Sequence, residues 1–298
     1  MYKFYVALSL MAIVVTSCEK DITIKTKAQE PQLVVEAIIE NNEFPLVFLS
    51  NSLDYFGQIS PQQVANSFVS GATITINNGT ITHTLREYAQ PIGGGITVKF
   101  YSADALNPTT AFVGQVNKTY KLAITTGGKS YTASTTIPII NRRIDSFWWA
   151  NVPQIADTNW KRIFIKAYDP PGLGDNIRYY TKRNSEPFYA GVPTSAFDDA
   201  FIDGTQYEFE IIRGVDRNNA RPDGIYSQYF KRGDTVTFKT SQIDKATYDF
   251  WRTMEYNYQS IGNPFSTPIK VLSNIKGAPA LGYFGGYGAQ FHTLIIPR

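Results

Sequence analysis

The residue types that carry out acid–base, nucleophilic or metal chemistry are scarce in this 298-residue sequence. It contains two histidines, His83 and His292, and one cysteine, Cys18. Each histidine lies in a strand-like segment with no motif partner beside it, which favours a structural role. The motifs of serine hydrolases, zinc peptidases and phosphate-binding loops are absent from the sequence. We therefore predict no catalytic residue and a protein that is not an enzyme.

Aspartates are the chemistry-bearing residues that do cluster. Asp169 and Asp175 flank a Pro-Pro-Gly turn, and Asp198, Asp199 and Asp203 lie in a later loop. Oxygen-rich loops of this kind hold Ca²⁺ in other proteins. Their spacing does not match an EF-hand, and aspartates are ordinary loop residues, so we predict no metal and no cofactor. A calcium site and a hydrolase that uses paired carboxylates stay open as alternatives, because distances between carboxylates are not visible in sequence.

The charge balance limits the classes of partner. The chain has 28 Lys and Arg against 25 Asp and Glu, a formal net charge of +3, and only 18% of its residues are charged. This charge is too weak and scattered for a dedicated nucleic-acid binder, so we expect no nucleic-acid partner. Aromatic residues make up 14% of the chain, which favours β structure and surfaces that bind other molecules.

Tyrosines gather in the last third of the chain. We interpret them as core residues, as part of a protein interface, or as a stacking platform for a glycan or a peptide. We predict that the glycine-rich stretch 282–288 forms a turn whose aromatic side chains pack against the fold. The candidate binding residues are Tyr226, Tyr229, Tyr256, Tyr283 and Tyr287.

One tripeptide offers a modification site. Asp234, Thr235 and Val236 fit an Asp-Ser/Thr-aliphatic pattern that resembles the O-glycosylation site of secreted Bacteroidetes proteins. Thr235 is therefore the candidate glycosylated residue.

The first thirty residues have the pattern of an export and anchoring segment. Lys3 precedes an apolar run over residues 4–15, which is too short for a permanent membrane span and is typical of a signal peptide. The run ends in Val-Thr-Ser-Cys, which resembles the bacterial lipobox. We predict a signal peptide over 1–17, a lipid on Cys18 and a polar tether over 18–30. Lys20 between acidic residues resembles a surface-export signal, so exposure at the cell surface is an open possibility.

From residue 33 onward the pattern predicts β-strands. Short β-branched or alternating segments are separated by turn residues, and Asn78-Gly79 between two such segments indicates a hairpin. About seven segments before Pro138 predict an Ig-like or transthyretin-like β-sandwich over residues 31–138. Further strand segments predict a second β-rich domain over residues 139–298.

One long helix is predicted in the second domain, over residues 242–259. Ser241 is its expected N-cap, and Gly262 ends it. We expect its apolar face to pack on a sheet. The residues that recur at helical spacing on that face are Ile243, Ala246, Phe250, Met254 and Tyr258.

An ordered series of short motifs runs through the chain. They include Ser-Cys-Glu at 17–19, PQLVVE at 31–36, SGATI at 70–74, TYKL at 119–122, YDPPG at 168–172, NPF at 263–265, SNI at 273–275 and GYFG at 282–285. Together they resemble the DUF4249 family of Bacteroidetes outer-membrane lipoproteins over nearly the whole mature chain. The resemblance implies a lipid-anchored outer-membrane protein that accompanies a TonB-dependent receptor, and it supplies no catalytic residues.

Three functions remain open on the sequence. The leading hypothesis is a non-enzymatic accessory subunit, anchored in the outer membrane by its lipid, that docks on a TonB-dependent β-barrel receptor through its aromatic C-terminal half. The first alternative is an independent lipoprotein that binds a glycan or a peptide. The second alternative is a hydrolase.

Overall fold

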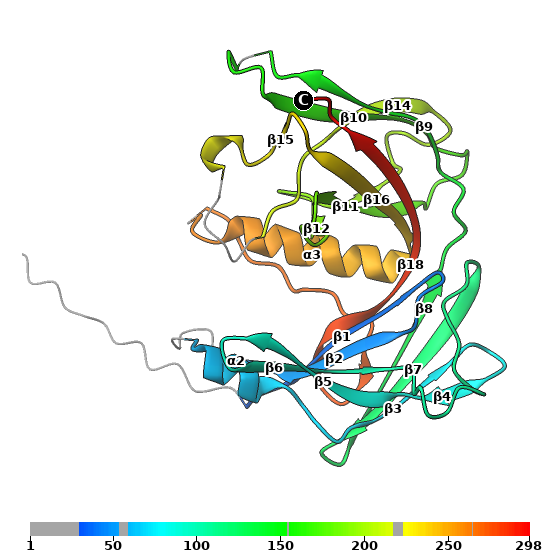
Figure 1. The fold of residues 1–298 in the computed structure, drawn as a ribbon. Helices are drawn as coiled ribbons and strands as arrows, with labels where there is room; N and C mark the ends of the chain where they lie inside the picture. The colour runs from blue at the N-terminus through cyan, green and yellow to red at the C-terminus, as the bar shows by residue number, and fades with distance from the viewer. Residues whose placement is uncertain (1–29, 54–58, 154, 217–222, 264) are drawn as a thin grey trace, which may run out of the picture. The chain divides into compact units, whose positions relative to one another are not determined.

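The computed structural model describes residues 30–53, 59–153, 155–216, 223–263 and 265–298. The predicted signal peptide, Cys18 and nearly all of the predicted tether lie outside the described residues. Residues 31–298 form one compact unit (Figure 1). Its fold is mostly β, which is the fold class that the sequence predicted.

The largest sheet of this unit has nine strands. Eight of its strands follow the order β12-β11-β16-β18-β1-β2-β6-β5, and β13 pairs with β11. The nine strands are β1 (Leu33–Glu40), β2 (Leu46–Asn51), β5 (Arg86–Gly93), β6 (Ile96–Ser102), β11 (Asn176–Arg183), β12 (Tyr189–Ala190), β13 (Ala196–Asp198), β16 (Thr235–Ile243) and β18 (Ala280–Ile295).

Two smaller sheets pack on it. A five-stranded sheet in the order β17-β8-β7-β3-β4 covers one part, and a four-stranded sheet, β14-β10-β15 with β9 also paired to β10, covers another. Their strands are β3 (Thr73–Asn77), β4 (Thr82–Thr84), β7 (Lys118–Thr126), β8 (Lys129–Ile137), β9 (Arg143–Asn151), β10 (Trp160–Tyr168), β14 (Gln206–Ile211), β15 (Phe230–Lys231) and β17 (Lys276–Gly277). Each packing encloses its own hydrophobic core.

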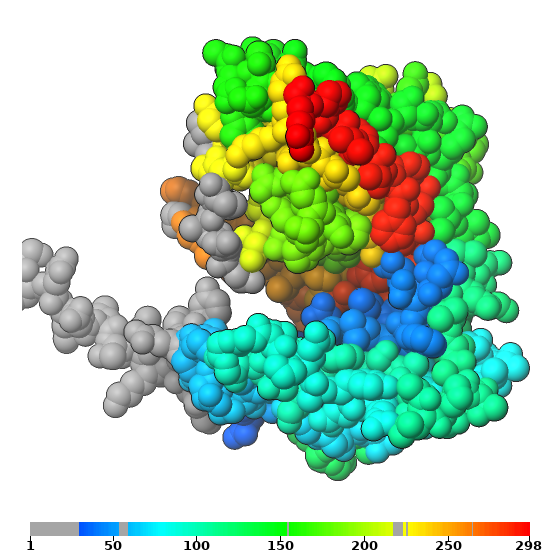
Figure 2. Space-filling view, in the orientation of Figure 1, coloured from blue at the N-terminus to red at the C-terminus, as the bar shows by residue number. Residues whose placement is uncertain are grey.

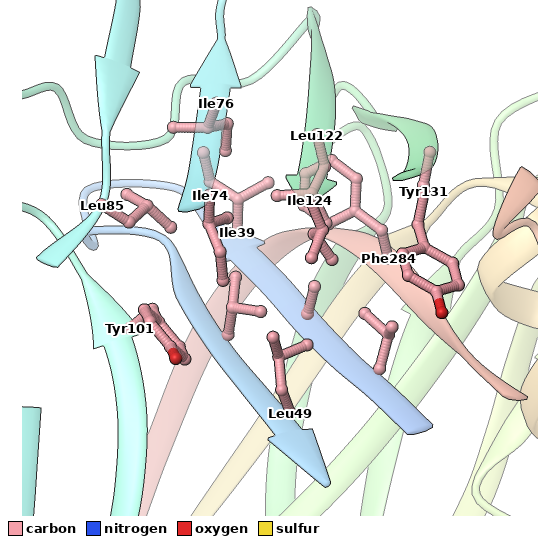
Figure 3. Close-up of a cluster of buried hydrophobic side chains, with 14 of the residues drawn as sticks. Ile39, Leu49, Ile74, Ile76, Leu85, Tyr101, Leu122, Ile124, Tyr131 and Phe284 are labelled. Carbon is pink, nitrogen blue, oxygen red and sulfur yellow. The ribbon is translucent and has the colours of Figure 1, made fainter. Parts of the chain in front are cut away.

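The first core lies between the nine-stranded and the five-stranded sheets. Alternate residues of β1, β3 and β7 point into it, as the period of two in a half-buried strand requires. Figure 3 shows Ile39, Leu49, Ile74 and Leu122 meeting there, together with Phe284 from the far end of the chain. The second core, around Phe238, lies between β16 and the four-stranded sheet.

The first and last strands join the two predicted domains. β1 pairs in parallel with β18, from Leu33 opposite Ala280 to Glu40 opposite Tyr287. β16 pairs with the other edge of β18. The nine-stranded sheet therefore contains strands from both sides of the expected boundary at 138/139.

The glycine-rich stretch 282–288 is the interior of β18, and the expected turn was wrong. A Cβ on Gly286 would lie 2.5 Å from the carbonyl oxygen of Thr136, and one on Gly288 would lie 2.9 Å from that of Pro138. These glycines let β18 approach the backbone of residues 136–138 closely. They are therefore required by backbone packing, and the stretch stays extended.

The predicted long helix exists but begins later than expected. α3 spans Lys245–Ser260, and its N-cap is Asp244, whose side chain accepts a hydrogen bond from the Thr247 N–H at 2.9 Å. Ser241 belongs to β16, because ladder pairing with β11 and β18 continues to Ile243. A second helix, α2 (Pro61–Ser67), was not predicted; Ser60 and Gln63 form its capping box. A 3-10 turn, η1, spans Gly224–Tyr226.

Candidate binding surface

The five candidate tyrosines do not form one platform. Tyr283 and Tyr287 are each 3% exposed and lie in a core between β18 and α3. The Tyr283 ring stacks on Phe250 with centroids 4.4 Å apart, and the Tyr287 hydroxyl accepts a hydrogen bond from the Trp251 indole at 2.9 Å. These two side chains fix the helix on the sheet.

A buried arginine completes that core, and sequence patterns did not reveal it. Arg178 on β11 donates to the Ser195 hydroxyl and to the Tyr180 hydroxyl, each at 2.9 Å, and lies over the Trp251 ring. The carboxylate of Glu255 on α3 accepts from the backbone N–H of Ser195 at 2.9 Å. Because the charged groups are bonded to their neighbours, we interpret this network as structural.

Tyr226 and Tyr229 lie in a different part of the fold. Tyr226 packs on Trp160 with ring centroids 5.0 Å apart, and the Lys231 ammonium lies 4.5 Å from the same Trp160 ring. Both tyrosines are half-buried. Their neighbours belong to β10 and β15, whereas Tyr283 and Tyr287 contact α3.

Tyr256 is the candidate that lies on an exposed surface. It is on α3, whose apolar residues do not all pack where the sequence predicted. Phe250 is buried, but Ala246, Met254 and Tyr258 are exposed. α3 contacts β11, β13 and β18 chiefly along its first three turns. The apolar stripe therefore continues beyond the part of the helix that is buried.

The stripe extends into the segment that follows the helix. Met254, Tyr258 and Ile261 are spaced by four and three residues, so they share one face. Phe265 is 94% exposed, and Asn257 holds the segment against the helix through hydrogen bonds with both backbone groups of Ile269. We call this area the α3 surface. It consists of Met254, Tyr258, Ile261, Phe265, Ile269 and Leu272, all of them exposed, whereas the exposed Tyr256 lies on the opposite side of the helix.

The nine-stranded sheet also has an aromatic face that is only half covered. Phe48 on β2, Phe100 on β6 and Tyr88 on β5 lie side by side, with centroids 6.0 and 5.6 Å apart. Glu36 on β1 is exposed, yet burial raises its pKa against the opposing charge of Arg178. A carboxyl group that is both accessible and surrounded by protein lies in a concavity. Figure 2 shows a hollow beside the blue residues of β1 and β2, above the cyan strands.

An apolar cavity of about 200 Å³ lies in the second core. Aromatic and aliphatic side chains form most of its wall, including Tyr179, Phe197 and Phe209. A glycan needs several hydrogen-bonding groups around its hydroxyls, and Arg142 and Asp198 are the charged residues on this wall. The cavity therefore suits an apolar group better than a sugar.

Both histidines lie in strands, His83 in β4 and His292 in β18, and His83 is tied into the fold by hydrogen bonds. His83 is 1% exposed; its Nδ1 lies 2.7 Å from the Thr110 hydroxyl, and its Nε2 accepts a hydrogen bond from the Asp104 N–H at 2.9 Å. Burial lowers the pKa of His83, which keeps the ring neutral. Burial also lowers the pKa of His292 in β18.

The candidate glycosylation residue begins a strand inside the large sheet. Thr235 is half-buried and opens β16; its backbone N–H donates to the Asn184 side chain at 2.9 Å. The Asp234 carboxylate accepts from the same asparagine at 2.9 Å. Glycosylation of Thr235 stays a prediction.

The fold and this surface define a β protein with three hydrophobic cores and an apolar helix face that the described residues leave exposed. Over residues 19–291 the chain matches the domain of unknown function DUF4249, and it belongs to that family. The predicted family is thus confirmed. No curated protein and no solved structure matches the chain. Within the described residues, no helix is long and apolar enough to cross a membrane.

Proposed function

We propose that this protein is a lipid-anchored accessory subunit of the outer membrane that docks on a TonB-dependent β-barrel receptor, and that the α3 surface is its docking surface. The family, the lipobox-like sequence at Cys18 and the lack of catalytic motifs in the sequence support the proposal. It assigns no enzymatic role to the chain.

The observation that carries the proposal is the apolar stripe of α3 that runs past its buried turns. Ile261 is 65% exposed and Phe265 is 94% exposed, and they follow Tyr258 by three and seven residues in the sequence. Continuous exposed apolar patches of this kind mark interaction sites in soluble domains. Covering them releases about 25 cal/mol for each Å² of apolar area removed from water.

If the lipoprotein and the receptor are held in the same membrane, a small apolar surface is sufficient for a stable complex. A lipid on Cys18 would confine the protein to the layer that holds the receptor. Confinement raises the effective concentration of the two partners, so a modest apolar interface supports a stable complex. The long polar stretch between Cys18 and Pro31 would leave the folded unit room to reorient toward the receptor.

The test is affinity purification of the tagged native protein from gently solubilised membranes, with quantitative mass spectrometry of the proteins that accompany it. We expect a TonB-dependent β-barrel in stoichiometric amount. The double variant Ile261→Ser/Phe265→Ser should reduce its recovery at least tenfold without changing thermal unfolding, because both side chains are largely exposed. Leu106→Ser is the matched control, because Leu106 is 78% exposed and lies outside the α3 surface. Recovery of the lipoprotein without a barrel would refute the proposal.

The aromatic face beside Glu36, which lies opposite Phe48 in the sheet, favours one competing function, capture of a glycan or a peptide. This face carries packed aromatic rings and one carboxyl group, which suit stacking and a charge-assisted hydrogen bond. Phe100→Ala should weaken such binding in a glycan and peptide screen and leave recovery of the receptor unchanged. The two functions thus respond to different variants.

A further inference from the structure

Two loops of the second core bring their aspartates together. The first loop, residues 169–175, follows β10; the second, residues 199–204, follows β13. The Asp199 carboxylate accepts hydrogen bonds from the backbone N–H groups of Gly174 at 2.8 Å and Asp175 at 2.9 Å. Asp203 accepts one from Gly172 at 2.6 Å. These bonds fix the two loops against each other.

Three carboxylates converge between the loops. One oxygen each from Asp169, Asp175 and Asp199 lies within 4.8 Å of the other two. A Ca²⁺ ion binds oxygen at about 2.4 Å, so ligands of one ion lie at most about 4.8 Å apart. The three oxygens therefore satisfy the distance limit for a shared ion.

Asp169 provides a second observation that points to a cation. Its side chain is 0% exposed, and one carboxylate oxygen forms an ion pair with the Arg142 guanidinium. Neither oxygen accepts a hydrogen bond from the part of the chain that the structure describes, although Oδ1 is in ion-pair contact with Arg142. A fully buried carboxylate oxygen without a partner is costly, because it has lost its water.

The charge of the cluster is also uncompensated. Asp169, Asp175 and Asp199 converge, Asp203 binds the same loop, and in the described residues Arg142 forms an ion pair with Asp169 alone of these four. An additional cation would offset both the burial and the repulsion.

We propose that Asp169, Asp175 and Asp199 bind a calcium ion that joins the loops 169–175 and 199–204. The donors are all carboxylate oxygens, which suit hard cations and not the thiophilic metals. Three convergent carboxylates, one of them without access to water, suit Ca²⁺ better than Mg²⁺, which retains several of its water ligands. The ion would fix the loops that present Leu173 and Phe201, which are 72% and 99% exposed.

The test uses the full chain in detergent, stripped with EDTA and titrated with CaCl₂ by calorimetry and thermal unfolding. We expect one ion per chain with a dissociation constant at or below about 10⁻⁴ M. At about one hundred times that constant, the Tm should rise by roughly 5 °C or more. MgCl₂ and NaCl at matched ionic strength should give a much smaller shift.

Two matched variants locate the site. Asp175→Asn removes a charged ligand from a half-buried position and should weaken calcium binding at least about tenfold. Asp145→Asn makes the same chemical change in an exposed ion pair with Arg143, and it should bind calcium as the unmodified chain does. The hydrogen bonds that join the two loops are accepted by the side chains of Asp199 and Asp203, and none of them uses the Asp175 side chain. The Asp175→Asn variant should therefore fold.

Three results would overturn the proposal. The first is an unchanged Tm at about 10 mM calcium, ten times the weakest dissociation constant of extracellular calcium modules. The second is an equal shift with Mg²⁺, and the third is unaltered binding by Asp175→Asn. None of these results depends on whether the protein docks on a receptor.

Discussion

Two carboxylate clusters in the second half of the chain are compensated in opposite ways. Asp223 lies 2.8 Å from the Lys231 ammonium, 2.8 Å from the Arg213 guanidinium and 3.0 Å from that of Arg183. Glu186 shares the two arginines. Around Asp169, the counter-ion of the carboxylates is Arg142. Among the described residues, three cations thus pair with two acids in the first cluster, whereas in the second the one ion pair joins Arg142 to Asp169 and leaves three further aspartates beside it.

The pKa values of Asp223 and Asp169 differ in the direction that their numbers of neighbouring cations predict. Burial would raise the pKa of Asp223, but the bonds from Lys231 and Arg213 and the charge of Arg183 outweigh it and lower the pKa well below its usual value. The pKa of Asp169 is raised instead. The first cluster is electrostatically complete within the protein, whereas the second has the composition of a site that takes its cation from solution.

The largest contrast is expected when one arginine is removed from each cluster. Arg142→Met leaves Asp169 buried beside three like charges and should lower the free energy of unfolding by about 3–5 kcal/mol in EDTA. Arg213→Met leaves Lys231 and Arg183 on Asp223 and should cost about 1–2 kcal/mol. Urea unfolding measures both values. Calcium should restore part of the loss in the Arg142 variant and none in the Arg213 variant; equal losses that ignore calcium would contradict the comparison.

A smaller effect is expected for Asp223→Asn. This variant replaces charge-assisted hydrogen bonds by weaker ones and leaves Glu186 as the one acid of the cluster beside its three cations. We expect a loss of about 2 kcal/mol in the free energy of unfolding, the same in EDTA and in calcium. A calcium-dependent loss would show that the two clusters are coupled.

Asp175→Asn should have opposite effects in the two ionic conditions. Without calcium it removes one of the like charges around Asp169 and should stabilise the fold by about 1 kcal/mol. With calcium it removes a ligand and should leave the variant less stable than the unmodified chain. Thermal unfolding in EDTA and in calcium tests this reversal of sign. Destabilisation in both conditions would mean that Asp175 only supports its loop.

Much of the fold was predictable because its strands are half-buried. In β7, Tyr120, Leu122 and Ile124 alternate with exposed residues, so the period of two is visible in the sequence. The helix boundary was missed because Ser241 is as good an N-cap as Asp244, and strand pairing decides between them. The stretch 282–288 was misread because glycine usually marks turns, whereas here it allows close contact between backbones.

The sites were less predictable, because they depend on contacts between distant segments. The aspartates at 169–175 and 199–203 were visible as two groups, but their convergence depends on β11 pairing with β13. Arg142, their counter-ion, comes from the segment before β9 and carries no local signal. Tyr283 and Tyr256 look alike in sequence, and only the position of α3 buries one and exposes the other.

The smallest expected effect is the pH dependence of the two clusters. The pKa of Asp223 is lowered in the folded state, so its stabilisation is full above about pH 4 and is lost as the pH falls further. The pKa of Asp169 is raised, so in EDTA its ionisation removes stability as the pH rises above about 4. Calcium competes with protons for Asp169, and the stabilisation that calcium provides should therefore shrink steadily between pH 7 and pH 4. Urea unfolding over this range, in EDTA and in calcium, measures that difference; a difference that does not change with pH would show that calcium does not bind the Asp169 carboxylate.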